Sequence, residues 1–327
     1  MVKIGDVAAA ADVSVATVSR TLNNNSTVDP ALAERVRAAA ESLGYRPNAV
    51  ARNLRRRRTS VWALVITDIE NPFYTAVARG VEDAARSNGY SVLLCNSDED
   101  QEREARYLQV AAGEHVAGLI LAPRNASTDV SELRAAGIPV VVVDRSCGAE
   151  LDTVRTKSSE GARIATEHLL AEGWRRPACI TGPADAETAE ARHAGSVLAV
   201  DAHGTDDLTR HVSYDSEGGR AAAADLLDSD ARPDAFFVAN SMLALGVLGE
   251  LRRRALRVGS DVGLVMFDDA PWARLLDPAI SVVSQSAYEM GGRAGELLLD
   301  RLSGSGPAEP RNEYLPATLI VRESSRR

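Results

Sequence analysis

Short apolar runs alternate with helical stretches from residue 61 onward, and this alternation limits the possible folds more than any other feature of the sequence. The runs have the length and the Val, Leu and Ile content of strands buried in a parallel sheet. They are VWALVI (61–66), SVLLC (91–95), GLILA (118–122), PVVVV (139–143), PACIT (177–181), AFFVA (235–239) and VGLVMF (262–267). We predict a helix from Ser159 to Gly173 and two doubly wound α/β lobes, joined near Val154 and near Ser281. Ligands bind such lobes at the carboxyl ends of the strands.

The first sixty residues have a different pattern, in which apolar positions and helix caps predict three short helices. The first helix ends at Asp12, a residue type that tolerates left-handed backbone. Ser14 is a good N-cap for the second helix, and Asp29 followed by Pro30 begins the third, which stops at Gly44. This is the geometry of a helix-turn-helix, whose second helix enters the major groove of DNA. A three-helix bundle that binds protein, or nothing, is the alternative.

Charge is distributed unevenly along the chain, and its basic part coincides with these helices. The formal net charge of the 327 residues is −9. Residues 1–60 hold ten basic and five acidic side chains, which gives +5 and leaves −14 for the remainder. A basic module attached to an acidic body is typical of a protein that binds a polyanion such as DNA.

Catalytic and metal-binding motifs find no support in the sequence. It contains no G-x-G-x-x-G after the first apolar run, no Walker P-loop and no G-x-S-x-G. The five histidines have no metal-ligand spacing, and the three cysteines are predicted to be core thiols. The chain also lacks a long uncharged apolar run and an apolar leader. We therefore expect a cytoplasmic protein that is not an enzyme, with no cofactor, no metal and no membrane partner.

The whole chain resembles the LacI/GalR (lactose-repressor) family. In the headpiece the resemblance rests on VSVATVSR, LGYRPN and VARNL at that family's spacings. In the body it rests on TDIENPFYTAVARGVEDAA, HLLAEGWRRPACITGP, TAEARHAG, FDDAPWARLLDP and SQSAYEMGGRAGELLLDRL. The resemblance implies a helix-turn-helix headpiece followed by a two-lobed effector domain similar to periplasmic sugar-binding proteins.

The resemblance also implies which residues meet DNA. In the second helix these are Val15, Ala16 and Arg20 at the bases and Ser14, Thr17 and Ser19 near the phosphates. An arginine suits guanine, and small apolar side chains suit thymine methyl groups. Residues 48–58 match a hinge helix and linker, with expected contacts at Asn48, Ala51 and Leu54. The basic run 55–58 is expected to contact phosphate, with Arg55 as the candidate, and a solvated linker is the alternative. Leu54 would be a minor-groove wedge that pairs with its copy in a second subunit.

For the effector, the resemblance implies contacts from Phe73, Lys157, Arg192, Tyr214, Asn240 and Asp268. Lys157 stands where the family usually has an aspartate, and Asn240 is followed by Ser241 instead of Asp. Two cationic side chains against one carboxylate predict a cleft with net positive charge. Such a cleft favours an anionic effector, either a sugar phosphate or a carboxylate, over a neutral sugar. The alternative is that Lys157 pairs with Asp268 and closes the site, which would leave a regulator that responds to no effector.

These observations predict three segments: a helix-turn-helix DNA-binding domain (1–47), a hinge helix and linker (48–58), and an effector-binding and dimerisation domain of two α/β lobes (59–327). We expect a homodimeric repressor that binds double-stranded DNA at a pseudo-palindromic operator. A small-molecule effector would control its affinity. A sugar-binding protein of transport type and an α/β enzyme with a helical accessory domain are the competing hypotheses.

Overall fold

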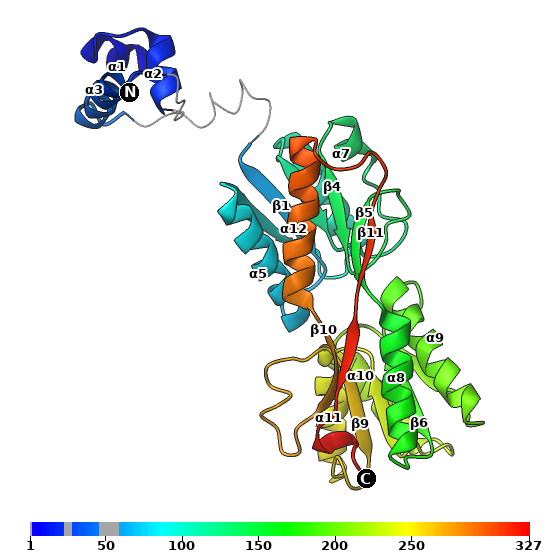
Figure 1. The fold of residues 1–327 in the computed structure, drawn as a ribbon. Coiled ribbons are helices and arrows are strands. Elements are labelled where there is room, and N and C mark those ends of the chain that lie inside the picture. The colour runs from blue at the N-terminus through cyan, green and yellow to red at the C-terminus, as the bar shows by residue number, and fades with distance from the viewer. Residues whose placement is uncertain (1, 23–27, 46–58) are drawn as a thin grey trace. The chain divides into compact units, whose positions relative to one another are not determined.

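The computed structural model describes residues 2–22, 28–45 and 59–327. The chain divides into two compact units, Met1–Thr59 and Ser60–Arg327 (Figure 1). The first unit contains the helices α1 (Ile4–Ala10), α2 (Val15–Leu22) and α3 (Pro30–Ser42). Val7, Val18 and Val36 are fully buried where the three helices pack together.

The helix boundaries of the first unit follow from local chemistry. Asp12 has a φ of 51° in the turn after α1, and Gly44 has a φ of 62° after α3. The Ser14 hydroxyl accepts a hydrogen bond from the amide of Thr17 at 3.1 Å, which caps the start of α2. The Asp29 carboxylate accepts hydrogen bonds from the backbone amides of Ala31 and Leu32, in the first turn of α3. The predicted caps and turns are therefore confirmed at these positions.

The second unit has two lobes. Lobe 1 contains the strands β1 (Val61–Ile66), β2 (Ser91–Asn96), β3 (Gly118–Leu121), β4 (Val140–Val143), β5 (Asp152–Thr156) and β11 (Asn312–Leu315), and the helices α5 (Pro72–Ser87), α6 (Gln101–Gly113), α7 (Ser131–Ala135) and α12 (Ala287–Ser303). Lobe 2 contains the strands β6 (Pro177–Thr181), β7 (Leu208–His211), β8 (Ala235–Val238), β9 (Gly263–Phe267), β10 (Ser281–Gln285) and β12 (Ala317–Ile320), the helices α8 (Ser158–Ala171), α9 (Glu187–Ala202), α10 (Ser216–Asp228) and α11 (Ser241–Arg253), and the 3-10 helix η1 (Glu323–Ser325).

The two sheets have the same strand order. It is β11-β5-β4-β3-β1-β2 in lobe 1 and β12-β10-β9-β8-β6-β7 in lobe 2. All strands pair in parallel except β12, which runs antiparallel to β10. Helices cover both faces of each sheet, as the alternation along β1 illustrates: Trp62 and Leu64 pack with α5 and α12, whereas Ala63 and Val65 pack on the side of α6. The predicted pair of doubly wound lobes is confirmed.

Glycines allow the covering helices to pack closely. A Cβ on Gly80 of α5 would lie 2.1 Å from the carbonyl oxygen of Tyr288, and a Cβ on Gly291 of α12 would lie 2.0 Å from that of Val77. Only glycine permits this backbone approach. The pairs α8 with α9 and α10 with α11 meet in the same way, through Gly195 and Gly246.

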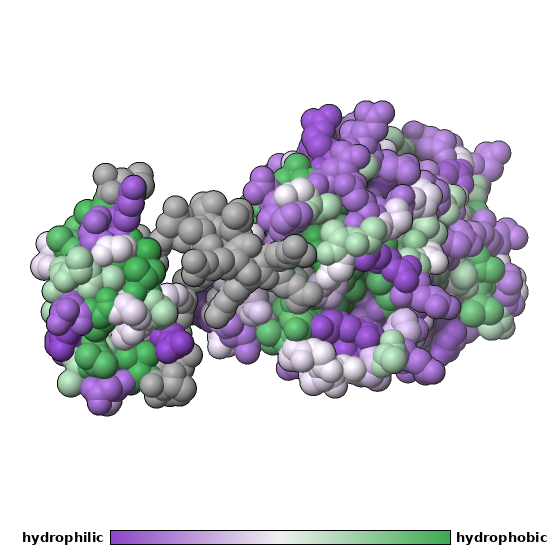
Figure 2. All heavy atoms as spheres, turned by 90° about the horizontal axis from the view of Figure 1, so that it is seen from above, coloured by the Kyte–Doolittle hydropathy of each residue, from purple (hydrophilic) through white to green (hydrophobic). Residues whose placement is uncertain are grey.

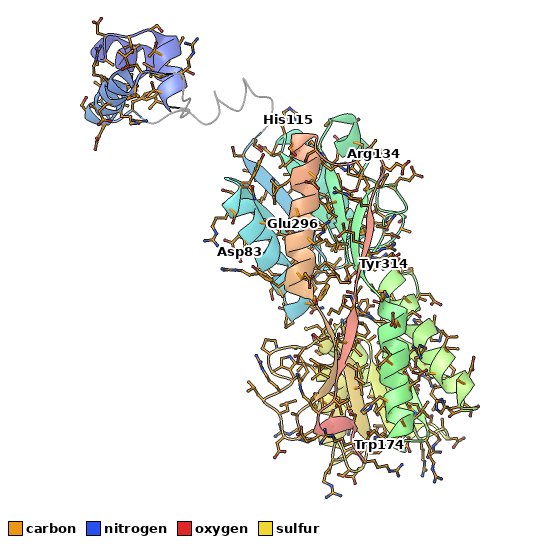
Figure 3. All side chains as sticks on the ribbon, viewed as in Figure 1. Asp83, His115, Arg134, Trp174, Glu296 and Tyr314 are labelled. Carbon is orange, nitrogen blue, oxygen red and sulfur yellow. The ribbon has the colours of Figure 1, made fainter. Side chains whose placement is uncertain are left out.

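The chain passes between the lobes three times within residues 59–327. It crosses between β5 and α8, between β10 and α12, and between β11 and β12. The sequence predicts the first two crossings and misses the third. Tyr314 lies on β11 close to that third crossing (Figure 3). The guanidinium of Arg155 stacks 4.8 Å from the centre of its ring.

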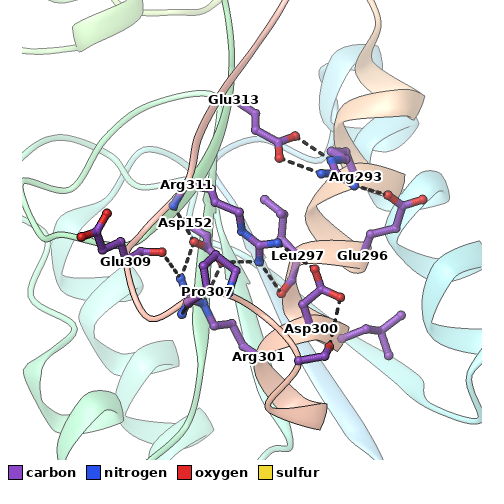
Figure 4. Close-up of polar contacts among 12 residues, drawn as sticks. Asp152, Arg293, Glu296, Leu297, Asp300, Arg301, Pro307, Glu309, Arg311 and Glu313 are labelled. Carbon is purple, nitrogen blue, oxygen red and sulfur yellow. Dashed lines mark hydrogen bonds and ion pairs between the residues drawn. The ribbon is translucent and has the colours of Figure 1, made fainter.

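A buried carboxylate anchors the segment that leads into β11. Asp152 of β5 accepts hydrogen bonds from Arg301 of α12 at 2.7 and 2.9 Å and from the side chain of Arg311 at 2.9 Å (Figure 4). Arg293 of α12 forms a bidentate pair with Glu313 of β11. These contacts fix β11 and the segment before it to β5 and α12 of the same lobe. Nearly 150 residues separate Asp152 from Arg301 in the sequence.

Three further observations bear on the sequence predictions. Cys95, Cys147 and Cys179 are buried free thiols, as predicted. Among the helices in the described part of the chain, none is long and apolar enough to cross a bilayer. Figure 2 shows hydrophilic residues over most of the visible face of the second unit, with hydrophobic residues scattered among them.

Candidate functional site

A cavity of about 410 Å³ lies between the two lobes, and most of its lining follows the carboxyl ends of strands. Its volume is within the range of small-molecule sites, roughly 300–1,000 Å³. Lobe 1 contributes Thr67, Asp68, Glu70, Asn71, Phe73, Tyr74, Asp98, Glu99, Asp144 and Arg145. Lobe 2 contributes Thr188, Arg192, Ser213, Tyr214, Asp215, Asn240, Met242, Asp268 and Gln285. This is the position at which doubly wound sheets bind ligands.

Arg145 organises the wall that lobe 1 forms. Its side chain is 4% exposed and donates two hydrogen bonds to the carboxylate of Glu99, at 2.7 and 2.9 Å. A third hydrogen bond goes to the carbonyl oxygen of Arg124. The guanidinium also lies 5.5 Å from the ring centre of Tyr214, so it faces an aromatic group of lobe 2 across the cavity.

Arg192 has the corresponding role in lobe 2. It is buried, its guanidinium stacks 4.0 Å from the ring centre of Phe267, and one terminal nitrogen donates to the carbonyl oxygen of Ala239 at 2.6 Å. Within the described protein its Nε has no hydrogen-bond partner. Arg192 is thus fixed in orientation while part of its donor capacity is unused.

Burial shifts the pKa values of several groups that line the cavity. It raises the pKa of Asp268, which accepts a hydrogen bond from the side-chain amide of Gln285 at 2.6 Å. It also raises the pKa values of the Tyr74 and Tyr214 hydroxyls. The two phenols are therefore neutral and can donate hydrogen bonds, and Tyr74 already donates to Asp144 at 3.0 Å.

Ion pairs join the lobes on one side of the cavity. Glu187 of α9 accepts hydrogen bonds from Arg155 at 2.6 Å and from the amide of Ser146 at 2.5 Å. Asp185 accepts from Arg124 at 2.8 Å. Because these pairs connect opposite lobes, their geometry depends on how closed the cavity is.

Five of the six residues predicted to contact an effector line this cavity, namely Phe73, Arg192, Tyr214, Asn240 and Asp268. Lys157 does not. It precedes the first turn of α8, its side chain is 54% exposed, and its Nζ lies 3.5 Å from Glu160. Ser241 begins α11 and is buried, and the side-chain oxygen Oδ1 of Asn240 caps that helix by accepting a hydrogen bond from the backbone amide of Leu243.

The predicted charge of the site was therefore wrong. The prediction of a positive cleft depended on Lys157, which lies outside the cavity. The lining contains seven acidic side chains and two arginines. The alternative in which Lys157 pairs with Asp268 also fails, since Lys157 pairs with Glu160 and Asp268 with Gln285.

Sequence reasoning missed much of the lobe 1 wall. Asp144 and Arg145 follow the run PVVVV directly, and Thr67 and Asp68 follow VWALVI directly. Polar residues immediately after a buried parallel strand are the signal that could have identified them.

In the first unit, the residues predicted to meet DNA share one side of α2. Val15, Ala16 and Arg20 are exposed, whereas Val18 and Thr21 are buried against the other helices. Ser14, Thr17 and Ser19 flank them: Ser14 is exposed and Thr17 and Ser19 are half-buried. Asn48, Ala51, Leu54 and Arg55 lie outside the described residues.

Arg35 has a structural role that the sequence did not predict. Its guanidinium donates to the carbonyl oxygens of Ala11 at 2.5 Å and Asp12 at 3.2 Å. These two residues form the turn between α1 and α2. Arg35 therefore stabilises the turn that sets the orientation of α2.

Known proteins match this chain over its whole length. A family model for bacterial regulatory proteins of the lacI family matches residues 3–48, and a model for a periplasmic binding protein-like domain matches residues 166–325. The ribose operon repressor of Bacillus subtilis is 36% identical over 329 residues, which cover 100% of this chain and 99% of the relative.

Two solved structures have the same architecture. The complex of the transcriptional regulator CelR with cellobiose is 32% identical, with a TM-score of 0.75 over 99% of this chain and 100% of that one. The lac repressor dimer bound to operator and the anti-inducer ONPF is 25% identical, with a TM-score of 0.88 over 100% of this chain and 99% of that one. With a relative above 30% identity over the full length, a helix-turn-helix unit and a two-lobed body, the chain belongs to the lacI family of bacterial regulatory proteins and is a DNA-binding transcriptional regulator.

Proposed function

We propose that this regulator is a homodimeric repressor whose affinity for a pseudo-palindromic operator is controlled by a neutral sugar. A monosaccharide such as ribose is the first candidate. The observation that carries the proposal is the composition of the cavity between the lobes. Seven carboxylic side chains and three amide side chains line it and can accept or donate hydrogen bonds, beside the aromatic rings of Phe73, Tyr74 and Tyr214. Ribose is suggested by the ribose operon repressor among the relatives.

The chemistry of the lining favours a neutral polyol over an anion. Carboxylates accept hydrogen bonds from hydroxyl groups, and the two arginines donate to hydroxyl or ring oxygens. Arg145 is already paired with the carboxylate of Glu99, so Arg192, which donates to the carbonyl oxygen of Ala239, is the arginine with unused donor capacity. A phosphate in this cavity would face an excess of negative charge, which costs binding free energy. The anionic effector expected from the sequence is therefore replaced by a neutral one.

For DNA, we propose that residues 1–47 read the operator, residues 48–58 form a hinge, and residues 59–327 bind the effector and the second subunit. Exposed Val15, Ala16 and Arg20 would contact bases, with Ser14, Thr17 and Ser19 near phosphates. Asn48, Ala51, Leu54 and Arg55 would contact the centre of the operator, where a pyrimidine–purine step such as CG unstacks at low cost. Leu54 would be the wedge at that step.

A hydrophobic edge of lobe 1 supports dimerisation. Strand β2 is at the edge of its sheet, and Leu93 and Leu94 on it are 43% and 39% exposed. Exposed apolar side chains on an edge strand favour contact with another surface. Because such a regulator must reach chromosomal DNA, the proposal includes a cytoplasmic location.

One experiment tests the DNA and effector parts together. Operator duplexes are first selected from a random pool with the full-length protein, and their affinity is then measured with and without ribose, ribose 5-phosphate and cellobiose. We expect a pseudo-palindrome and a change in operator affinity with a neutral sugar. A change in operator affinity with ribose 5-phosphate but with no neutral sugar would overturn the proposal of a neutral effector.

The competing functions predict other outcomes. A transport-type binding protein would bind sugar and show no selection from the random pool, and the basic first unit argues against that reading. Our proposal assigns no catalytic step to the cavity, so the bound sugar should be recovered chemically unchanged. Turnover of the sugar would favour the enzyme hypothesis.

A further inference from the structure

Two histidines and a glutamate that are distant in the sequence come together on lobe 2. Glu190 and His193 are one turn apart on α9, and His211 is the last residue of β7. One potential ligand atom from each of the three residues lies within 4.8 Å of the other two. The imidazole rings of His193 and His211 are 5.2 Å apart between centres and nearly perpendicular. The spacing along the sequence gave no indication of this cluster, because the fold brings α9 and β7 together.

The hydrogen bonds of the two histidines leave one nitrogen of each available. His193 Nε2 lies 3.1 Å from a carboxylate oxygen of Asp207, and His211 Nδ1 lies 2.9 Å from the carbonyl oxygen of Gly182. Both partners are acceptors, so in the neutral rings these nitrogens carry the protons. His193 Nδ1 and His211 Nε2 then hold lone pairs. Histidines that bind metals are oriented in this way, with the second nitrogen donating to a carboxylate or carbonyl oxygen.

The third group and the local charge fit a divalent cation. One carboxylate oxygen of Glu190 lies 3.9 Å from His193 Nδ1, and the Glu190 side chain is 60% exposed, so it is free to change rotamer. Tetrahedral zinc with bond lengths near 2.1 Å needs ligand atoms about 3.4 Å apart, so the atoms, which lie within 4.8 Å of one another, would have to close by at most about 1.4 Å. The carboxylates of Glu190 and Asp207 provide the negative charge.

We propose that Glu190, His193 and His211 form a binding site for a divalent transition-metal ion of the zinc class, with Asp207 and Gly182 orienting the histidines. Two imidazoles and one carboxylate with a fourth position open to water are a common zinc ligand set. The ion would tie α9, which carries Thr188 and Arg192 of the cavity, to the strand that leads to Tyr214. This site goes beyond the proposed sugar response and does not depend on it.

The test uses the full-length protein without a histidine tag, freed of metal by a chelator and titrated with zinc ions in competition with a chromophoric chelator. We expect one zinc ion per chain with a dissociation constant in about the micromolar range or below. His193→Ala and His211→Ala should each weaken binding by at least about tenfold, and Asp207→Asn by about tenfold because it removes the orienting partner. His203→Ala is the matched control, since His203 follows the same helix, its Nδ1 lies 2.9 Å from the carbonyl oxygen of Ala199, and it is not part of the cluster.

A spectroscopic measurement distinguishes loss of the metal site from misfolding of a variant. Cobalt(II) bound to the wild-type protein should give the visible absorption of a tetrahedral site, and His211→Ala should lose that absorption while it keeps the wild-type far-ultraviolet circular dichroism. Loss of zinc binding in the His203→Ala control, or unchanged affinity in both His193→Ala and His211→Ala, would overturn the proposal. So would the absence of any stoichiometric binding by the wild-type protein.

Discussion

Asp144 and Asp268 occupy equivalent positions in the two lobes and line the same cavity from opposite sides. Asp144 follows β4 and Asp268 follows β9, the fourth strand in the corresponding series of each sheet. Both residues have left-handed backbone, with φ values of 66° and 77°. The amide of each donates to the neighbouring strand, to Val154 at 3.0 Å and to Val283 at 2.9 Å. Each lobe therefore places one buried carboxylate at the cavity by the same turn.

We expect Asp268→Asn to weaken effector binding and to stabilise the effector-free protein. A carboxylate that accepts sugar hydroxyls is worth about 1.5–3 kcal/mol, so ribose affinity should fall roughly 10- to 100-fold. The pKa of Asp268 is raised by burial, so its stabilising contribution is present at low pH and lost as the pH rises through the raised value. At neutral pH the Asp268→Asn substitution removes the free-energy cost of burying a charged carboxylate, while the amide oxygen still accepts the hydrogen bond from the side chain of Gln285.

Calorimetric titration with ribose and thermal unfolding without it measure the two effects separately. Asp261→Asn is the matched control, because Asp261 pairs with Arg257 on the surface and does not line the cavity. Weaker binding together with a lower melting temperature would indicate a general loss of structure, and unchanged binding would remove Asp268 from the effector site.

Gly182→Ala should disturb the effector cavity through Tyr214. A Cβ at Gly182 would lie 2.2 Å from Cζ of Tyr214, and the ring would have to move because no side chain can occupy that distance. Overpacking of this kind costs about 1–3 kcal/mol, and effector affinity should fall by about tenfold or more. Calorimetric titration measures the affinity. Gly249→Ala on α11 meets only open space and should leave binding unchanged; equal effects of both substitutions would contradict the steric argument.

Arg20→Ala should reduce sequence preference at one position in each operator half-site. Arg20 is exposed on α2, and an arginine that pairs with guanine contributes about 1–3 kcal/mol of discrimination. Competition binding with operators substituted one base pair at a time measures the effect. Arg37→Ala removes the same charge from α3, where Arg37 is 3.5 Å from Glu34, and should weaken all sequences alike. If Arg20→Ala also lowered affinity equally on every sequence, Arg20 would be a phosphate contact.

The sequence predicts those parts of the fold whose signal is continuous and local. The runs VWALVI and AFFVA are buried along their lengths, so their composition identifies them as central strands. Strand β7, with the sequence LTRH, and β11, with NEYL, lie near sheet edges and are only partly buried, so neither forms an apolar run. The third crossing was missed for that reason.

Side-chain direction limits what could be predicted of the site. Lys157 and Asp268 both follow strands, but Lys157 is adjacent to the start of α8 and extends into solvent, whereas the left-handed backbone at Asp268 places its carboxylate at the cavity. A motif gives the position of a residue along the chain and not the φ angle that directs its side chain. The metal-site cluster shows the same limit, since His193 and His211 meet only through the packing of α9 beside β7.

The final prediction concerns Asp152, whose contribution to stability should depend on pH. Its buried side chain would by burial alone have a raised pKa, but hydrogen bonds from Arg301 and Arg311 outweigh that effect and lower the pKa from 3.8 to about 2. A lowered pKa means that the contribution is complete above the ordinary value and is lost as the pH falls toward about 2. Asp152→Asn should therefore cost roughly 1–2 kcal/mol of unfolding free energy at pH 7, after allowance for solvent screening, and progressively less below pH 4. Urea unfolding at several pH values measures this difference, with Glu296→Gln as control because Glu296 pairs with Arg293 at the surface. A loss of the same size at every pH would show that Asp152 acts through packing and not through its charge.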